Sequence, residues 1–164
     1  MRYFITFTCY GGRLHGDESG SVDRHHNLVG SRLLESNPQR AMVERQRMLQ
    51  NPYLLNQEER AIVLASLRGH CAHRGWTLLA AHVRSNHVHV IVEAEIRPER
   101  IMNEFKSYAS RELTRLGKDG TKRKRWARHG STRWLWKDQD VWEAIRYVAE
   151  QQGEAMALFV AEEL

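Results

Sequence analysis

Apolar and polar residues alternate in several short stretches of this chain, a pattern typical of β-strands with one buried face. The stretch from Tyr3 to Cys9 alternates in this way and predicts a first strand. Two more strand-like runs, Trp76 to Val83 and His87 to Glu93, are joined by residues 84–86, and so short a connection favours a hairpin. A shorter run from Arg133 to Lys137 predicts a fourth strand.

Segments with helical periodicity separate these strands. Asn56 followed by Glu59 matches a capping box, and the helix that begins there is expected to end at Gly75. Pro98 suits the first turn of a second helix, whose apolar stripe continues to Gly117. A third helix is expected to begin between residues 138 and 140. This order of elements predicts an α+β fold, a ferredoxin-like or RRM-like antiparallel sheet with helices packed on it.

Length and composition fit one domain over residues 1–164, because 41% hydrophobic residues are enough for a single core. The polar, glycine-containing stretch after the first strand has little periodicity, so residues 11–55 are expected to form an insertion of a loop and a short helix. Cys9 and Cys71 are too few for a disulfide framework, and the chain has no signal-peptide pattern and no apolar run of membrane-spanning length. We therefore expect a cytoplasmic location and no membrane partner.

Positive charge is concentrated between Gly117 and Trp134. The net charge of the chain is +5, and Asp119 is the single acidic residue of this segment. Such a block attracts phosphate groups through the release of counterions, and tryptophans beside it can stack on unpaired bases. The predicted nucleic-acid contacts are Lys122, Arg123, Lys124, Arg125, Trp126, Arg128 and Arg133. The alternative interpretation is a solvated basic loop whose tryptophans belong to the core.

His87 and His89 flank a single valine within a strand-like run. Because successive side chains of a strand point to opposite faces, the two imidazoles are expected on one face and Val88 on the other. Neutral imidazole is a common ligand of divalent metals, and two of them on one strand leave much of the coordination sphere open. The pair alone favours neither a metal site nor a strand face that is merely polar.

The last predicted helix carries an apolar stripe and, away from it, a polar pair. The stripe consists of residues spaced by three and four positions: Val141, Ala144, Ile145, Val148 and Ala149. Tyr147 lies off this stripe, and Gln151 follows one turn later on the same side. If the histidines hold a metal, Gln151 can supply a third ligand while the Tyr147 phenol points at a bound phosphate. The alternative is an exposed tyrosine and a solvated amide. Tyr108, the rival nucleophile, flanks the apolar stripe of its own helix and is interpreted as structural.

Taken together, His87-Val88-His89 and the later Tyr147-Val148-Ala149-Glu150-Gln151 resemble the HUH endonuclease signature of the single-tyrosine transposases. This superfamily includes the IS200-like transposases and the REP-associated tyrosine transposases. Asn86 precedes the histidine pair, as is usual in that family, and the resemblance covers most of the chain. It implies a fold of the HUH endonuclease type.

The resemblance also implies an activity, that of a metal-dependent DNA strand-transferase. Tyr147 would form a 5′-phosphotyrosine link, and His87, His89 and Gln151 would hold Mg²⁺ or Mn²⁺. The implied partner is single-stranded or hairpin DNA, which would be nicked and rejoined in transposition or in a domesticated role. Family members place the tyrosine helix in their own active site or in a partner subunit's, so a homodimer is compatible with the resemblance. The alternative function is a catalytically silent nucleic-acid-binding protein on the same scaffold.

Overall fold

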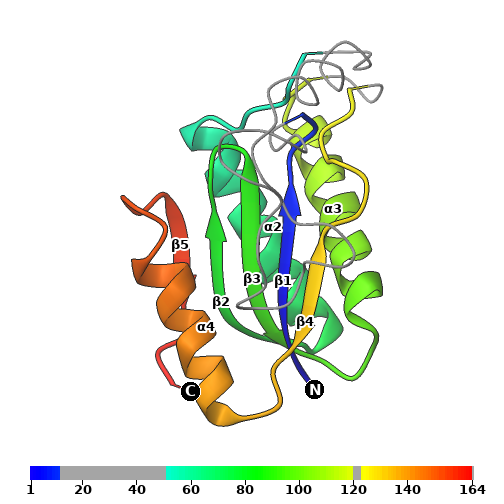
Figure 1. Cartoon of the computed structure of the whole chain (residues 1–164). Helices are drawn as coiled ribbons and strands as arrows, with labels where there is room; N and C mark the ends of the chain where they lie inside the picture. Colours follow the sequence, from blue (N-terminus) through cyan, green and yellow to red (C-terminus); the bar gives the residue numbers. More distant parts are fainter. Residues whose placement is uncertain (12–50, 120–122, 164) are drawn as a thin grey trace, which may run out of the picture.

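In the computed structural model, which describes residues 1–11, 51–119 and 123–163, five antiparallel strands form one sheet with three helices packed on it (Figure 1). The strand order across the sheet is β4-β1-β3-β2-β5. The strands are β1 (Arg2–Thr8), β2 (Thr77–Val83), β3 (His87–Glu93), β4 (Ser131–Trp134) and β5 (Ala157–Val160). The helices are α2 (Gln57–Arg74), α3 (Pro98–Arg115) and α4 (Asp138–Glu150).

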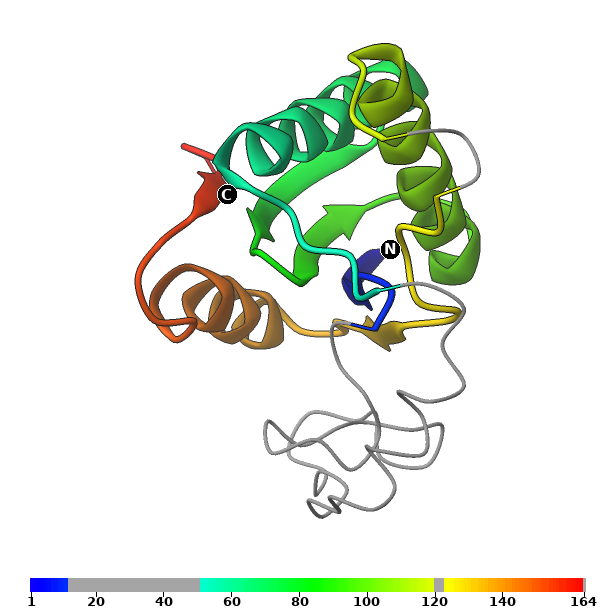
Figure 2. The same cartoon turned by 90° about the horizontal axis from the view of Figure 1, so that it is seen from above.

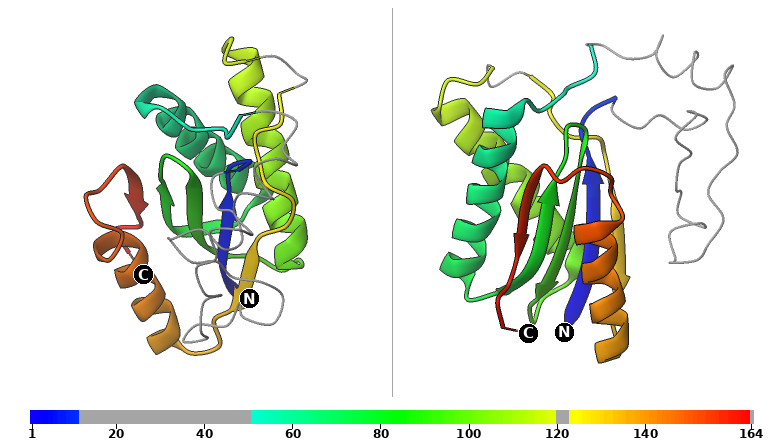
Figure 3. Two further views of the ribbon diagram at one scale, coloured as in Figure 1. Left: turned by 45° about the horizontal axis from the view of Figure 1, so that its top comes forward. Right: turned by 90° about the vertical axis from the view of Figure 1, so that its left-hand side faces the viewer.

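The helices form two layers with the sheet between them. Figure 2 and the right-hand view of Figure 3 show α2 and α3 on one face and α4 on the other. The alternation along the strands explains this arrangement, because each central strand has two apolar faces. Ile5 and Val90 belong to the core beneath α2 and α3, whereas Ile91 packs with Val148 of α4 and Phe4 in a second, smaller core. The position of α4 decides which strand face can carry a site.

Local sequence signals account for the helix ends. The Asn56 side chain accepts a hydrogen bond from the Glu59 backbone N–H at 2.8 Å, and the Glu59 carboxylate accepts one from the Asn56 backbone N–H at 3.0 Å, so the predicted capping box is formed. At the other end of α2, Gly75 has φ 71°, the left-handed conformation that favours glycine. Pro98 begins α3, as expected.

The expected α+β fold with an antiparallel sheet is confirmed, and the strand boundaries differ by small shifts. The predicted strand at residues 133–137 lies instead at Ser131–Trp134, because its pairing with β1 sets its limits. The last strand, β5, was not predicted. It is a short apolar run that pairs with β2 after the chain turns back from α4. Within the described residues, no helix is both long and apolar enough to cross a membrane.

The predicted insertion at residues 11–55, including its short helix, lies mostly outside the described residues. Its last residues, 51–55, are described, and two of them belong to the core. The side chains of Tyr53 and Leu55 are 2% and 1% exposed. The Tyr53 backbone N–H donates to the Tyr10 carbonyl, and the Leu55 N–H donates to the Ser85 carbonyl. The chain has thus joined the core by Tyr53, within the range predicted as the insertion.

Candidate active site

The two histidines of β3 lie on the face of the sheet that α4 covers. Their directly opposite partners on β1 are Thr8 for His87 and Thr6 for His89. The centroids of the two imidazole rings are 4.8 Å apart. His89 is 4% exposed and His87 is half-buried. The sequence prediction that both rings share one face is confirmed, since Val88 lies in the opposite core.

Hydrogen bonds to neighbouring side chains orient both imidazoles. His87 Nδ1 lies 2.6 Å from Asn86 Oδ1, and because a carbonyl oxygen only accepts, Nδ1 carries the hydrogen. His87 Nε2 is then the ring nitrogen whose lone pair can bind a cation. His89 Nδ1 lies 2.8 Å from the Thr6 hydroxyl, which can donate or accept. Thr6 can therefore bond Nδ1 in either tautomer, and the acceptor Gln152 Oε1, 3.1 Å from Nε2, places the hydrogen of His89 on Nε2 in this structure.

The glutamine that reaches the histidines is Gln152. Its Oε1 lies 3.1 Å from His89 Nε2. Gln151, which the sequence suggested as a ligand, is exposed and serves as the C-cap of α4, with its backbone N–H donating to the Tyr147 carbonyl at 3.1 Å. The helix ends at Glu150, and Gln151 has a non-helical ψ of 18°. Because the helix ends at Glu150, Gln151 does not lie one helical turn above Tyr147. The chain after the helix instead directs the Gln152 side chain toward the sheet.

Tyr147 lies above the same patch of the sheet. Its ring centroid is 5.8 Å from that of His89 and 6.0 Å from that of Phe4, both in edge-on arrangements. The Phe4 ring is in turn 5.6 Å from His89. Tyr147 is 40% exposed while its neighbour Val148 is buried, so the tyrosine lies off the apolar stripe of α4, as expected. The side of α4 that carries Tyr147 is thus partly open to solvent.

The donor set suits a divalent cation that accepts nitrogen and oxygen ligands. It consists of two imidazoles on one strand and one amide oxygen at His89. The described part of the chain has no cluster of three or more His, Cys, Asp or Glu side chains that could hold a metal. A metal at this place would therefore depend on an amide oxygen and on substrate or water for its remaining ligands.

A family model of IS200-like transposases matches residues 44–152. This match covers more than half of the chain. The protein belongs to the IS200-like transposase family. The matched range includes the histidine pair, Tyr147 and both glutamines.

A solved structure of a REP-associated tyrosine transposase bound to a REP hairpin is also similar. The two chains are 11% identical, with a TM-score of 0.47, and the alignment covers 90% of this chain and 63% of that one. This chain thus spans less than two thirds of the length of that transposase. No curated protein matches.

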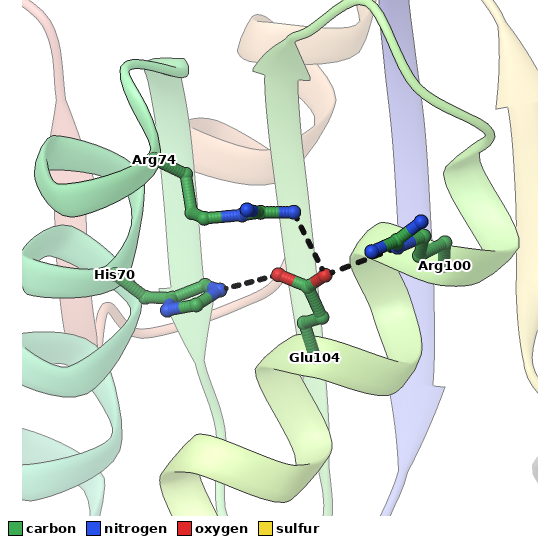
Figure 4. A network of polar contacts seen from close by, with 4 residues as sticks. All are labelled: His70, Arg74, Arg100 and Glu104. Carbon is green, nitrogen blue, oxygen red and sulfur yellow. Dashed lines mark hydrogen bonds and ion pairs between the residues drawn. The ribbon is translucent and has the colours of Figure 1, made fainter.

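A hollow in the described part of this protein lies on the other layer. It has a volume of about 860 Å³ and lies between α2 and α3. Tyr108 lines it and stacks on His70, with ring centroids 4.2 Å apart. Figure 4 shows the nearby Glu104 carboxylate held by three cationic or imidazole partners, His70, Arg74 and Arg100. The sheet separates this groove from the histidine pair, which agrees with a structural role for Tyr108.

Two of the predicted nucleic-acid contacts of this protein are interior residues. Arg125 is 4% exposed and donates to the backbone carbonyls of Ser110 and Lys118. Trp126 is 9% exposed, and its indole N–H lies 3.0 Å from both the Lys106 carbonyl and the Ser110 hydroxyl. Both side chains fasten the segment after α3 to that helix. Both side chains are buried in this structure, and their role as DNA contacts stays a prediction.

The remaining predicted nucleic-acid contacts differ in their exposure and in the face of the protein on which they lie. Lys124 and Arg128 are exposed, and Arg123 is half-buried with its guanidinium 5.1 Å from the Tyr53 ring. Lys122 lies outside the described residues. Arg133 is directly opposite Phe4 on β4, so it shares the sheet face of Phe4, His89 and Tyr147. The basic segment thus places one of its cations on the sheet face of the candidate active site.

Thr6 and Gln152 are site residues that the sequence alone did not identify. Thr6 could be found only with the register of β1 against β3, because it faces His89 across strands distant in sequence. Gln152 is adjacent to the predicted Gln151, and only the end of α4 decides between them.

Proposed function

We propose that this protein is a metal-dependent strand-transferase that nicks and rejoins single-stranded or hairpin DNA, with Tyr147 as its nucleophile. The observation that carries the proposal is the approach of the accessible Tyr147 ring to His89, 5.8 Å between centroids, within one chain. Membership of the IS200-like transposase family supports DNA as the substrate. A subunit of this kind contains both the histidine pair and a tyrosine that can serve it.

The reaction is a transesterification at phosphorus. The Tyr147 hydroxyl oxygen forms a bond to the phosphorus of the scissile phosphodiester and loses its proton. The bond from phosphorus to the 3′-oxygen breaks, and that oxygen leaves as a 3′-hydroxyl. The product is a 5′-phosphotyrosine link, which keeps the energy of the broken bond. A 3′-hydroxyl can then attack this link and rejoin DNA without an added energy source.

His87, His89 and a glutamine, Gln152 in the observed conformation, would hold the divalent ion, Mg²⁺ or Mn²⁺. When bound, such an ion stabilises the negative charge that develops on the phosphate oxygens. The chain itself orients the ligands, because Asn86 fixes the ring of His87 and Thr6 fixes that of His89. Arg133, on the same sheet face, adds positive charge for the DNA backbone.

A covalent-adduct experiment tests this function. The protein is incubated with end-labelled hairpin DNA that has a single-stranded flank, in Mn²⁺ or Mg²⁺, and resolved on a denaturing gel. We expect an adduct with the wild type and with Tyr108→Phe, and none with Tyr147→Phe. Tyr108 is a matched control, because it is 41% exposed against 40% for Tyr147.

Each other outcome contradicts a stated part of the proposal. An adduct that persists in Tyr147→Phe and disappears in Tyr108→Phe would mean that Tyr108, on the opposite face of the sheet, is the nucleophile. Cleavage without any adduct would indicate a water nucleophile and a simple hydrolase. Binding without cleavage would indicate the catalytically silent DNA-binding protein.

A further inference from the structure

His82 is a fully buried histidine of β2 that lies directly beside the candidate site. Its exposure is 0%, and it is the cross-strand partner of His89. Its Nδ1 lies 2.9 Å from the Val148 carbonyl oxygen of α4. Its Nε2 accepts a hydrogen bond from the Met156 backbone N–H, also at 2.9 Å. The imidazole of His82 therefore connects β2 to the last turn of α4 and to the residue before β5.

The two bonds of His82 hold both ends of one turn. Val148 follows Tyr147 in the last turn of α4, where backbone carbonyls have no partner within the helix. Met156 directly precedes β5. The turn between them carries Gln152, whose side chain contacts His89. The imidazole of His82 thus fixes the segment that presents both the tyrosine and the glutamine.

The bonding pattern also defines the chemical state of His82. The Val148 carbonyl can only accept and the Met156 N–H can only donate, so the ring is neutral and carries its hydrogen on Nδ1. Burial lowers the pKa of His82 below its ordinary value, and the charge of Arg84 adds to this effect. An apolar side chain could fill the same space, but it would leave the buried Val148 carbonyl and the Met156 N–H without the hydrogen bonds that His82 makes.

We propose that His82 is a positioning residue for the strand-transfer reaction, because it pins the last turn of α4 and the turn after it so that Tyr147 and Gln152 both face His89. This inference rests on the proposed function. The hydrophobic contacts of α4 hold the helix to the sheet by its apolar stripe, but they allow small rotations and shifts. The two directional bonds of His82 restrict these motions at the end of the helix nearest the site.

Loss of His82 should therefore lower the rate of the chemical step and leave DNA affinity unchanged. A displacement of about 1 Å at a reacting group can reduce a rate about a hundredfold. DNA affinity depends on exposed cations elsewhere, which do not contact His82. A residue with a purely structural role would instead lower the amount of active protein and leave the rate per folded molecule unchanged.

The test compares His82→Leu and His82→Asn with a matched control, His70→Leu. His70 is another buried histidine, 6% exposed, whose Nε2 bonds to Glu104 on the opposite layer. Single-turnover adduct formation is measured at saturating hairpin DNA with Mn²⁺, together with the DNA dissociation constant and the thermal midpoint. We expect His82→Leu to lower the rate about tenfold to a hundredfold, with the dissociation constant within about twofold. His82→Asn keeps a donor near Nδ1 and should lose less.

A rate loss in His70→Leu equal to that in His82→Leu, at comparable thermal midpoints, would overturn the proposal. So would a folded His82→Leu variant with the wild-type rate. If His82→Leu does not fold, the rate of His82→Asn serves as the test. A wild-type rate in His82→Asn would likewise overturn the proposal.

Hydrogen exchange separates failure of this inference from failure of the proposed function. Peptides that cover residues 147–157 should exchange faster in the His82 variants than in the wild type, while peptides from β1 and α2 remain unchanged. If the wild type forms no adduct, the proposed function fails, and the exchange result alone decides whether His82 positions this segment. Unchanged exchange over residues 147–157 would show that it does not.

Discussion

The edge of the Tyr147 ring approaches the imidazole of His89, with 5.8 Å between the ring centroids, although one residue lies on the last helix and the other on the central strand. Packing of α4 against the sheet sets this distance. Phe4 contacts both rings from β1 and so links the two elements. Packing of α4 on the sheet therefore brings the candidate nucleophile close to the candidate ligands within one chain.

The two adjacent glutamines should differ in their effect on metal binding. Gln152 Oε1 contacts His89, whereas Gln151 is an exposed helix cap, so Gln152→Ala should weaken Mn²⁺ binding about tenfold or more and Gln151→Ala within about twofold. Calorimetric titration of Mn²⁺ into each variant measures this difference. The reverse order would mean that α4 gains another turn when metal binds, and Gln151 would again be the third ligand.

The basic segment should divide into residues that bind DNA and residues that maintain the fold. Arg128 is exposed, so Arg128→Ala should reduce by about one the slope of log affinity against log salt concentration, with no loss of stability. Arg125 is buried and bonds to two backbone carbonyls, so Arg125→Ala should lower the free energy of unfolding by about 1–3 kcal/mol. Its salt slope should remain that of the wild type.

Filter binding at several salt concentrations and chemical denaturation measure the two effects. Equal salt slopes in Arg128→Ala and the wild type would remove Arg128 from the DNA-binding surface. A lower salt slope in Arg125→Ala, at unchanged stability, would mean that this side chain leaves the interior when DNA binds.

Local periodicity was enough to predict the parts of the site that lie within one element. The alternation of β3 placed His87 and His89 on one face, and the apolar stripe of α4 placed Tyr147 away from the core. The strand register, the end of α4 and the bonds of His82 could not be predicted in the same way. Each depends on which backbone groups meet after folding, and the spacing of residues in a sequence carries no such information.

Composition was a poor guide to the basic segment for a related reason. A run of cations beside tryptophans predicts a DNA surface equally well whether its members point outward or inward. Arg125 points inward because the carbonyls of Ser110 and Lys118 satisfy its guanidinium in the interior. A buried cation of this kind can be recognised only when its acceptors are known.

Substitution of Gly130 should destabilise the connection to β4. A Cβ atom at this position would lie 2.5 Å from the Thr6 carbonyl oxygen and 2.6 Å from the Met102 sulfur. The Thr6 oxygen belongs to β1 and cannot move without disturbing the strand, so Gly130→Ala should lower the free energy of unfolding by about 1–3 kcal/mol. Gly69 on α2 is the control, since a Cβ there meets nothing within 4 Å.

Thermal or chemical denaturation measures the change in stability of the two glycine variants. If this geometry is correct, Gly130→Ala lowers the free energy of unfolding and Gly69→Ala raises it. Gly69→Ala should stabilise the protein by about 0.5–1 kcal/mol, because alanine favours the helix more than glycine does. A Gly130→Ala variant as stable as the wild type would mean that the segment before β4 does not pass this close to β1.

The state of His82 predicts how stability depends on pH. Burial holds the folded-state pKa of His82 below its ordinary value of 6.5. At a pH between the folded-state pKa and the ordinary pKa, the unfolded chain binds a proton that the folded protein does not. Titration of His82 therefore does not lower the free energy of unfolding above about pH 6.5. Below this pH the free energy of unfolding declines, with a slope of at most about 1.4 kcal/mol per pH unit from this group. Denaturation curves between pH 7.5 and pH 5 should show a steeper decline in the wild type than in His82→Asn, which retains every other titratable group. Parallel declines in the two proteins would mean that the imidazole takes up a proton in the folded state as readily as in the unfolded chain, and the Met156 N–H bond to its Nε2 could not then persist.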